Sequence, residues 1–252
     1  MSRKVALYVD GFNFYYGVTN HYRSGREKRG YSLSGLCWTA FRAMVERHFL
    51  QADETLAHVR YFTAPVTAAV ETTGRPGEHN RYETWMKAVR TITGIEVISG
   101  FYKPHGAEPG QSAKSRDEKQ TDVNLAVELL LDGLAGVYER AIVLSGDADE
   151  IPSIIAAAYR LPQARRVLVL LPPAQNLEDW KKRYCEAAFA AKARTELHRT
   201  CPNHVEARVL TESQLANSLL HYELPDVSCP PYWRLPAHYL QEKCQPQWNP
   251  AG

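Results

Sequence analysis

Residues 141–152 read Ala-Ile-Val-Leu-Ser-Gly-Asp-Ala-Asp-Glu-Ile-Pro. The four apolar residues predict a buried strand, and the acids and the proline after them predict a turn into a helix. The N-terminus has the same order, because a largely apolar run at residues 4–9 ends at Asp10 and Gly11. Strands that are apolar along their whole length are typical of parallel sheets covered on both faces.

The same alternation continues along the chain. Further strands are predicted at residues 58–63, 95–102 and 166–171, and helices at residues 33–49, 81–92, 123–134 and 151–160. Strands and helices that alternate in this way form βαβ units with right-handed crossovers. The sequence therefore predicts one doubly wound α/β domain with a mainly parallel sheet.

The last part of the chain has a different composition. Three elements are expected to complete the edge of the sheet: a helix at 177–191, a strand at 205–210 and a helix at 212–220. The domain is expected to span residues 1–225, because residues 226–252 are rich in proline and aromatic residues and show no periodicity. This segment is predicted to be a tail that lies on the domain or is loose. Residues 103–120 are expected to form a long polar loop.

Composition excludes several classes of protein. The chain has 252 residues, 44% of them hydrophobic, with 30 Lys and Arg against 28 Asp and Glu. These values exclude the disordered, collagen-like and membrane-spanning classes. A net charge of +2 means that any nucleic-acid binding must come from a local basic patch. The N-terminal apolar run is broken at Asp10, too early for a signal peptide, so we expect a cytoplasmic protein without a membrane partner.

Acidic residues follow two of the predicted strands. Asp10 ends the first strand, and Asp147 and Asp149 follow the strand at residues 141–144. If these strands are neighbours, their acids meet at the edge of the sheet where parallel sheets bind ligands. Asp122, at the start of a predicted helix, is expected to join them.

Four carboxylates in one cleft repel each other unless a cation is bound. Ligands that are all oxygen favour Mg²⁺ or Mn²⁺, which can activate water and stabilise the leaving oxygen in phosphodiester cleavage. The competing interpretation is that each Asp is a helix cap or a turn residue.

Three neighbouring residues have open roles. Thr121 is expected to cap the helix that follows it. Asn13 is expected to cap a helix near Phe14 or to orient Asp10. Glu150 either joins the site or occupies the first turn of a helix.

Three motifs stand in order along the chain: Val-Asp-Gly-Phe-Asn at residues 9–13, Lys-Gln-Thr-Asp-Val-Asn-Leu-Ala-Val at residues 119–127 and Ile-Val-Leu-Ser-Gly-Asp-Ala-Asp-Glu-Ile-Pro at residues 142–152. These motifs resemble the NYN branch of the PIN-like nuclease superfamily, which includes the LabA-like proteins. Together with weaker matches elsewhere in the chain, the resemblance extends over about residues 3–225. The resemblance implies a Rossmann-like three-layer sandwich with five or six mainly parallel strands. It also implies ribonuclease activity that depends on Mg²⁺ or Mn²⁺.

Carried over residue by residue, the resemblance assigns the metal and the catalysis to Asp10, Asp122, Asp147 and Asp149, with Asn13 as their catalytic polar partner. The position after Asp149 is often apolar or aromatic in this family, whereas here it is Glu150.

Substrate-binding candidates lie near these acids. Those expected to contact phosphate or substrate are Lys114, Arg116, Lys119 and Ser145. Further basic clusters lie at residues 23–29 and 181–183. Four aromatic residues beside the first motif could stack on unpaired bases, although core packing is their more common role: Phe12, Phe14, Tyr15 and Tyr16.

The sequence thus predicts a ribonuclease that hydrolyses RNA phosphodiester bonds at a four-aspartate site. The alternative is an RNA-binding or regulatory module of the same fold without activity. A haloacid-dehalogenase-like phosphatase is disfavoured, because it needs an Asp two residues after its nucleophile, where this chain has Phe12. The oligomeric state is open, with a homo-oligomer as one option.

Overall fold

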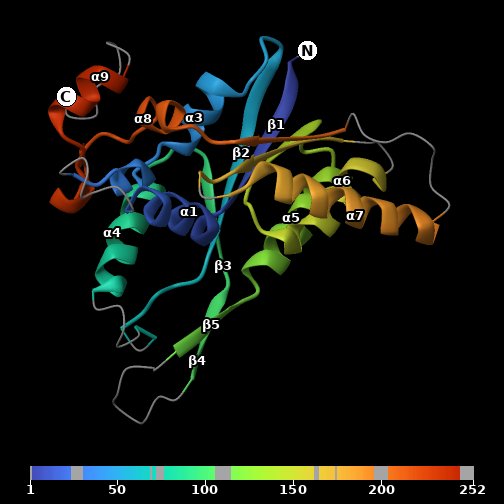
Figure 1. The fold of residues 1–252 in the computed structure, drawn as a ribbon, viewed down its shortest axis with the longest axis horizontal. Coiled ribbons are helices and arrows are strands. Elements are labelled where there is room, and N and C mark those ends of the chain that lie inside the picture. Colours follow the sequence, from blue (N-terminus) through green and yellow to red (C-terminus); the bar gives the residue numbers. More distant parts are fainter. Residues whose placement is uncertain are drawn as a thin grey trace.

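Six parallel strands form the central sheet, in the order β3-β2-β1-β6-β7-β8 (Figure 1). The structure is a computed structural model that describes residues 2–23, 31–68, 70–71, 77–105, 115–161, 165–173, 175–195 and 204–244. The strands of the sheet are Arg3–Asp10 (β1), Glu54–Thr63 (β2), Ile95–Ser99 (β3), Arg140–Leu144 (β6), Arg166–Leu171 (β7) and Val205–Val209 (β8).

Helices cover both faces of the sheet, so the fold is a Rossmann-like three-layer sandwich, as predicted (Figure 1). One layer holds Gly11–Arg23 (α1), Phe41–His48 (α3), Glu78–Arg90 (α4) and Glu212–Ala216 (α8). The other holds Thr121–Leu134 (α5), Ile151–Tyr159 (α6) and Leu177–Thr195 (α7). None of the helices in the described ranges combines the length and the apolar character that crossing a membrane requires.

The central strand β1 shows why the sequence forms this sandwich. Its side chains alternate between the two faces: Val5, Leu7 and Val9 belong to one core cluster, and Ala6 and Tyr8 belong to the other. All five are 1% exposed or less. A strand buried on both faces has to be apolar throughout, and this is the pattern that predicts it from sequence.

Two predicted elements are divided in the structure. The helix expected at residues 33–49 is a 3₁₀ turn, Ser34–Cys37 (η1), followed by α3. The strand expected at residues 95–102 is β3 and then Phe101–His105 (β4), which belongs to another sheet. Gly100 lies between the two strands. The chain at this point runs so close to the end of the neighbouring segment that a Cβ on residue 100 would lie 2.4 Å from the carbonyl oxygen of Lys119.

The prediction of a polar loop at residues 103–120 is wrong for those of its residues that the structure describes. Ser115–Lys119 (β5) pairs antiparallel with β4 and forms a two-stranded hairpin, and residues 106–114 lie outside the described residues. The hairpin projects away from the main sheet (Figure 1). Because β5 ends one residue before α5, the hairpin leads directly to Asp122.

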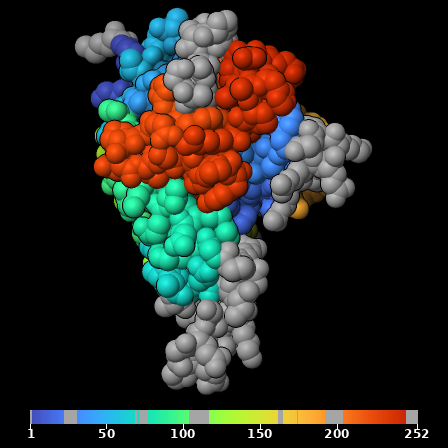
Figure 2. Space-filling model, turned by 90° about the vertical axis from the view of Figure 1, so that its left-hand side faces the viewer, coloured from blue at the N-terminus to red at the C-terminus, as the bar shows by residue number. Residues whose placement is uncertain are grey.

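The C-terminal segment packs on the layer that contains α1 and α4, as far as Cys244. It forms Glu223–Leu224 (β9), Val227–Ser228 (β10), Pro231–Trp233 (η3) and Ala237–Lys243 (α9). In Figure 2 this segment crosses the surface above α4. Trp233 is 3% exposed and Tyr239 2% exposed, so both belong to the core.

Three tryptophans from distant parts of the chain meet under this segment. The ring centroids of Trp38 and Trp85 are 5.8 Å apart, and Trp233 lies 5.9 Å from Trp38 and 6.4 Å from Trp85. Gly35 makes room for this contact, because a Cβ there would overlap the backbone of Trp233.

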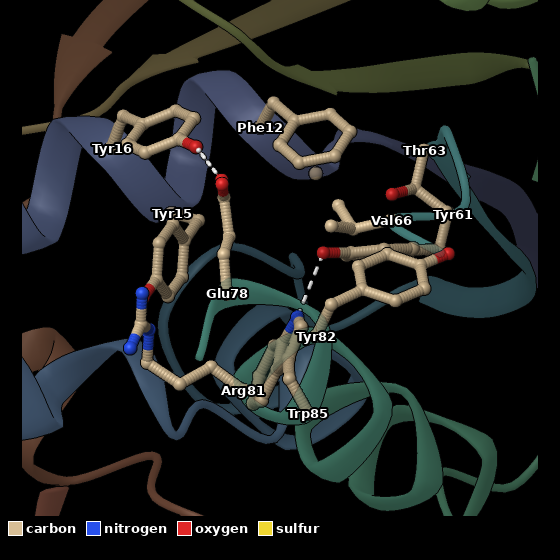
Figure 3. Close-up of a pocket in the computed structure, with 11 residues that line it drawn as sticks. Phe12, Tyr15, Tyr16, Tyr61, Thr63, Val66, Glu78, Arg81, Tyr82 and Trp85 are labelled. Atoms are coloured by element: carbon tan, nitrogen blue, oxygen red, sulfur yellow. Dashed lines mark hydrogen bonds between the residues drawn. The ribbon is translucent and has the colours of Figure 1, made fainter. Parts of the chain in front are cut away.

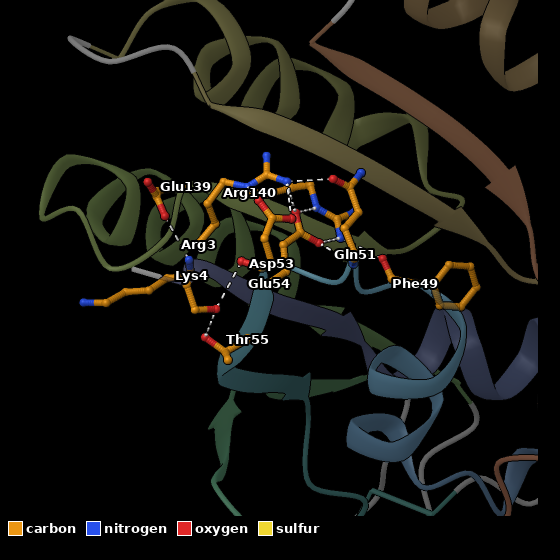
Figure 4. A network of polar contacts seen from close by, with 10 residues as sticks. Arg3, Lys4, Phe49, Gln51, Asp53, Glu54, Thr55, Glu139 and Arg140 are labelled. Carbon is orange, nitrogen blue, oxygen red and sulfur yellow. Dashed lines mark hydrogen bonds and ion pairs between the residues drawn. The ribbon is translucent and has the colours of Figure 1, made fainter.

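Charged residues join the amino ends of β1, β2 and β6 (Figure 4). Arg140 donates from Nε to Oε1 of Glu54 at 2.9 Å and from Nη2 to the carbonyl oxygen of Phe49 at 2.7 Å. The side chains of Arg140 and Glu54 are 9% and 0% exposed, so the ion pair is buried. Arg3 pairs with Asp53 at the edge of this network.

Candidate functional site

The acidic ends of β1 and β6 lie at one edge of the sheet because these two strands pair directly. A cavity of about 400 Å³ opens at this edge. Asp10, Asp122 and Asp147 all line it, and Glu118 of β5 adds a fourth carboxylate. Three of the four predicted aspartates are therefore brought together from three separate segments of the chain.

Asp10 is buried, at 5% exposed, and both of its carboxylate oxygens are engaged. Oδ1 accepts a hydrogen bond from the backbone N–H of Asn13 at 3.0 Å, and Oδ2 accepts one from Oγ of Ser145 at 3.0 Å. The first bond is a helix-cap interaction, so Asp10 also starts α1. Gly11 lets the helix begin here, because a Cβ would lie 2.5 Å from the ring of Tyr61.

Asn13 connects α1 to the loop after β6. Its Oδ1 accepts a hydrogen bond from the backbone N–H of Gly146 at 2.8 Å. In the same loop, the N–H of Asp147 donates to Oγ of Ser145 at 3.1 Å. Ser145 is buried, at 2% exposed, and does not line the cavity, so it contacts Asp10 from within the protein. These bonds fix Asp10 and Asp147 relative to each other.

Asp122 lies in the first turn of α5, where the positive end of the helix favours a carboxylate. The predicted cap by Thr121 is wrong: Thr121 is the first helical residue, and its buried Oγ1 has no hydrogen-bond partner. The cap position belongs to Gln120, with φ at 74°. Among the described non-glycine residues it is the only one with a positive φ, and such strain is often found at functional sites.

Asp149 and Glu150 differ in how far they are buried. Asp147 caps the 3₁₀ turn Ala148–Glu150 (η2) and accepts a hydrogen bond from the N–H of Asp149 at 2.9 Å. Glu150 is the last residue of this turn, and the charges of Asp122, Asp10 and Asp147 act on its carboxyl group. Glu150 is 1% exposed, whereas Asp149 is exposed and does not line the cavity.

Sequence reasoning left the role of Glu150 open, and the structure shows it buried beside the aspartates. Its Oε2 is 3.1 Å from Oγ of Ser153, and its Oε1 is buried without a hydrogen-bond partner. Its place directly after Asp149 in the acidic stretch that follows β6 is the sequence signal that pointed to it. Glu118 had no such signal, because its hairpin was expected to be a loop.

The pKa values reflect this crowding. Burial, and then the charges of Asp122 and Glu118, raise the pKa of Asp10 to about 7, although hydrogen bonds from Asn13 and Ser145 oppose the rise. Burial and the charge of Asp122 raise the pKa of Glu150 to about 8. Burial, followed by the charges of Asp147 and Asp149, also raises the pKa of Asp122.

The chemistry of these donors fits a hard divalent cation. All of them are carboxylates, and the negative charges around Asp10 and Asp122 contribute to the raised pKa of these two groups, an effect that a bound cation would oppose. Glu150 adds a buried oxygen without a hydrogen-bond partner. No three Asp, Glu, His or Cys side chains in the described ranges are already gathered closely enough to hold a metal ion. Binding therefore requires the carboxylates to turn toward each other.

The predicted phosphate-binding cations do not line the cavity in its described part. Lys119 is exposed on β5 and pairs with Asp117 at 3.4 Å. Lys114 and the side chain of Arg116 lie outside the described residues. The described lining has four acids and neither Lys nor Arg. A phosphate entering this cavity would thus meet negative charge unless a cation were bound.

An aromatic pocket adjoins the acidic cavity, between α1 and α4 (Figure 3). Its volume is about 30 Å³, enough for one or two waters. Two hydrogen bonds order its walls: Tyr16 OH donates to Oε1 of Glu78 at 2.8 Å, and Nε1 of Trp85 donates to Tyr61 OH at 2.8 Å. Phe12 and Tyr16 line both the pocket and the acidic cavity. Phe14, in contrast, is fully buried and cannot contact a ligand.

No protein-family model matches the chain. The sequence is 24% identical to the 6-hydroxy-3-succinoylpyridine 3-monooxygenase HspA of Pseudomonas putida, over 90% of this chain and 80% of that protein. A crystal structure of a protein of unknown function from Vibrio parahaemolyticus aligns with 84% of this chain and 94% of its own, with a TM-score of 0.42 and 15% identity. Neither similarity defines a family for the chain.

Proposed function

We propose that this protein is a metal-dependent ribonuclease that hydrolyses RNA phosphodiester bonds in the acidic cavity. One observation carries the proposal: carboxylates from the end of β1, the start of α5 and the loop after β6 line one cavity. The ordered motifs that resemble the NYN branch of the PIN-like nucleases contain the same three carboxylates.

In this proposal Asp10, Asp122 and Asp147 hold Mg²⁺ or Mn²⁺, and Glu150 supplies a further oxygen. When bound, the ion lowers the pKa of water and stabilises negative charge on the phosphate. Ser145 positions Asp10 by donating a hydrogen bond to it. Asn13 positions the loop that carries Asp147 by accepting a hydrogen bond from the N–H of Gly146. Asp149, which is exposed and does not line the cavity, acts on Asp122 through its charge.

Cleavage of labelled single-stranded RNA in Mg²⁺ or Mn²⁺ tests the proposal. We expect Asp10→Asn and Asp147→Asn to lower the rate by at least about 100-fold, because each removes a charge that the ion needs. Glu150→Gln is expected to lower the rate more than Asp149→Asn, since Glu150 is buried beside the acids and Asp149 is not. Chelation by EDTA is expected to stop the reaction.

Asp179→Asn is the matched control, because Asp179 lies exposed in the first turn of α7. It should cleave RNA as fast as the unmodified protein. Cleavage that survives Asp10→Asn and Asp147→Asn would show that another site, or a contaminant, is responsible. RNA binding without cleavage in either ion would support the silent RNA-binding module instead.

The similarity to HspA, together with the rings of Phe12 and Tyr16 in the acidic cavity, favours a second candidate function. HspA is named as a monooxygenase of a hydroxylated pyridine, and a cavity of about 400 Å³ with aromatic residues in its lining suits a planar ring. A monooxygenase reaction consumes O₂, two electrons from a reduced nicotinamide or flavin, and two protons; one oxygen atom enters the substrate and the other leaves as water.

Oxygen uptake with 6-hydroxy-3-succinoylpyridine and a reduced nicotinamide, with and without flavin, tests this candidate. Uptake that depends on the pyridine, without cleavage of RNA, would favour the monooxygenase over the ribonuclease. RNA cleavage with no pyridine-dependent uptake would exclude it.

A further inference from the structure

The residues that line the acidic cavity are of two chemical kinds. Some are the carboxylates described above, and others are the aromatic residues Phe12 and Tyr16 and the amide residues Asn20, Gln120 and Gln175. A metal site alone needs only the carboxylates. The aromatic and amide residues are the two kinds of group that recognise a nucleobase, because they offer a flat apolar surface and hydrogen-bonding groups.

The aromatic surface is rigid. Phe12 and Tyr16 lie one turn apart on α1, and their rings are nearly parallel, with centroids 6.1 Å apart and an interplanar angle of 19°. Tyr102 of β4 braces Phe12 edge-on at 5.6 Å. The hydrogen bond from Tyr16 to Glu78 holds the second ring in place (Figure 3). Rings held in this way lose little entropy when a base stacks on them.

The two volumes decide where a ring can bind. A cavity of about 400 Å³ is in the range of small-molecule sites, whereas the adjoining pocket of about 30 Å³ holds water and no ring. A base must therefore lie on the cavity side of Phe12 and Tyr16. A base in a duplex is stacked and paired, so only an unpaired nucleotide can present its face to this surface.

We propose that the cavity binds one unpaired nucleotide, with its base on Phe12 and Tyr16 and its phosphodiester toward Asp10, Asp122 and Asp147. The amides of Asn20 and Gln175 face the edge of the base. The inference rests on the proposed function and gives it a substrate class: single-stranded RNA, or the loops of folded RNA.

Two measurements test the base site separately from the chemistry. The first is binding of a fluorescent, uncharged dinucleoside methylphosphonate in EDTA, which needs neither a metal ion nor cleavage. Stacking contributes about 1–3 kcal/mol per base, so Phe12→Leu and Tyr16→Leu should each weaken binding by at least about fivefold. Leucine keeps an apolar side chain, and the melting temperature of each variant checks its fold.

Tyr232→Leu is the matched control, since Tyr232 is 54% exposed and lines neither cavity. It should bind the probe like the unmodified protein. No binding by the unmodified protein, or equal binding by the folded Phe12→Leu and Tyr16→Leu variants, would overturn the base site even if RNA is cleaved.

The second measurement is cleavage of an RNA hairpin in Mn²⁺. Cuts confined to the loop support the inference, and equal cleavage of the stem overturns it. If the hairpin stays intact but the probe binds through Phe12 and Tyr16, the ribonuclease proposal fails while the base site stands.

Discussion

At the scale of single residues, the main feature is that burial destabilises the charged forms of two acids, Asp10 and Glu150. Asp10 and Glu150 have pKa values of about 7 and 8, well above those of exposed carboxyls. At these two carboxyls the folded protein therefore binds more protons than the unfolded chain between about pH 4 and pH 8, and their contribution to stability falls as the pH rises through this window. Without a divalent ion, the site weakens the fold at neutral pH.

This linkage predicts that removing one charge stabilises the protein. Asp10→Asn, measured in EDTA at pH 8, should raise the free energy of unfolding by about 1–3 kcal/mol. Asparagine can keep both hydrogen bonds, because its Oδ1 accepts from Asn13 and its Nδ2 can donate to Ser145. The gain should shrink toward pH 4–5, where Asp10 is protonated in the folded protein. Urea unfolding at the two pH values measures both effects.

Asp179→Asn again serves as the control and should change stability little at either pH, since Asp179 is exposed. If Asp10→Asn were destabilising at pH 8, Asp10 would have to be a charged residue that the fold requires, which contradicts the pKa shift.

At the scale of elements, the buried ion pair between Arg140 and Glu54 joins β6 to β2 at the edge opposite the cavity (Figure 4). Burial tends to raise the pKa of Glu54, but hydrogen bonds from Arg140 and from the backbone of Gln51, with the nearby positive charges, bring it below its usual value. The pair therefore stabilises the fold above the unfolded pKa of about 4.3, and this contribution is lost as the pH falls through the folded pKa.

Arg140→Met is predicted to destabilise the protein by about 3–5 kcal/mol at pH 7, because Glu54 is then left charged and buried without its partner. Arg208→Met is the control: Arg208 pairs with Glu206 on the surface, with both side chains more than half exposed, and should lose no more than about 1 kcal/mol. Equal effects in denaturant unfolding would mean that the buried pair has no special role.

The elements also show what sequence can predict. The central strands β1, β6 and β7 were predictable because burial on both faces makes them largely apolar. The hairpin of β4 and β5 was not, since its strands are polar and their pairing depends on the close approach at Gly100. Local composition carries no signal for such a contact between distant segments.

The candidate site follows the same division. Asp10, Asp122 and Asp147 were predictable as neighbours, because strand ends in a parallel sheet meet at one edge. The inward position of Glu150 depends on a 3₁₀ turn, and the left-handed Gln120 takes the cap position that Thr121 was expected to hold. Both depend on backbone angles that residue types do not specify.

At the scale of the whole molecule, the C-terminal segment is part of the core. Trp233 is 3% exposed and contacts Trp38 and Trp85. Trp233→Ala is therefore predicted to destabilise the whole protein by about 3–5 kcal/mol, measured by thermal and urea unfolding. Tyr232→Ala, next to it and 54% exposed, should change stability by about 0.5 kcal/mol or less. An unchanged melting temperature for Trp233→Ala would mean that this segment is an appendage.

The three tryptophans give the molecule a built-in optical reporter. Indole rings within 6.4 Å of each other, in fixed and unequal orientations, couple their electronic transitions and give a near-ultraviolet circular dichroism signal that depends on this geometry. Because one ring comes from the C-terminal segment and another from α4, the helix that faces α1 across the aromatic pocket, the signal is sensitive to movement of either. Spectra of the unlabelled protein can therefore follow how this side of the fold responds when a ligand is added.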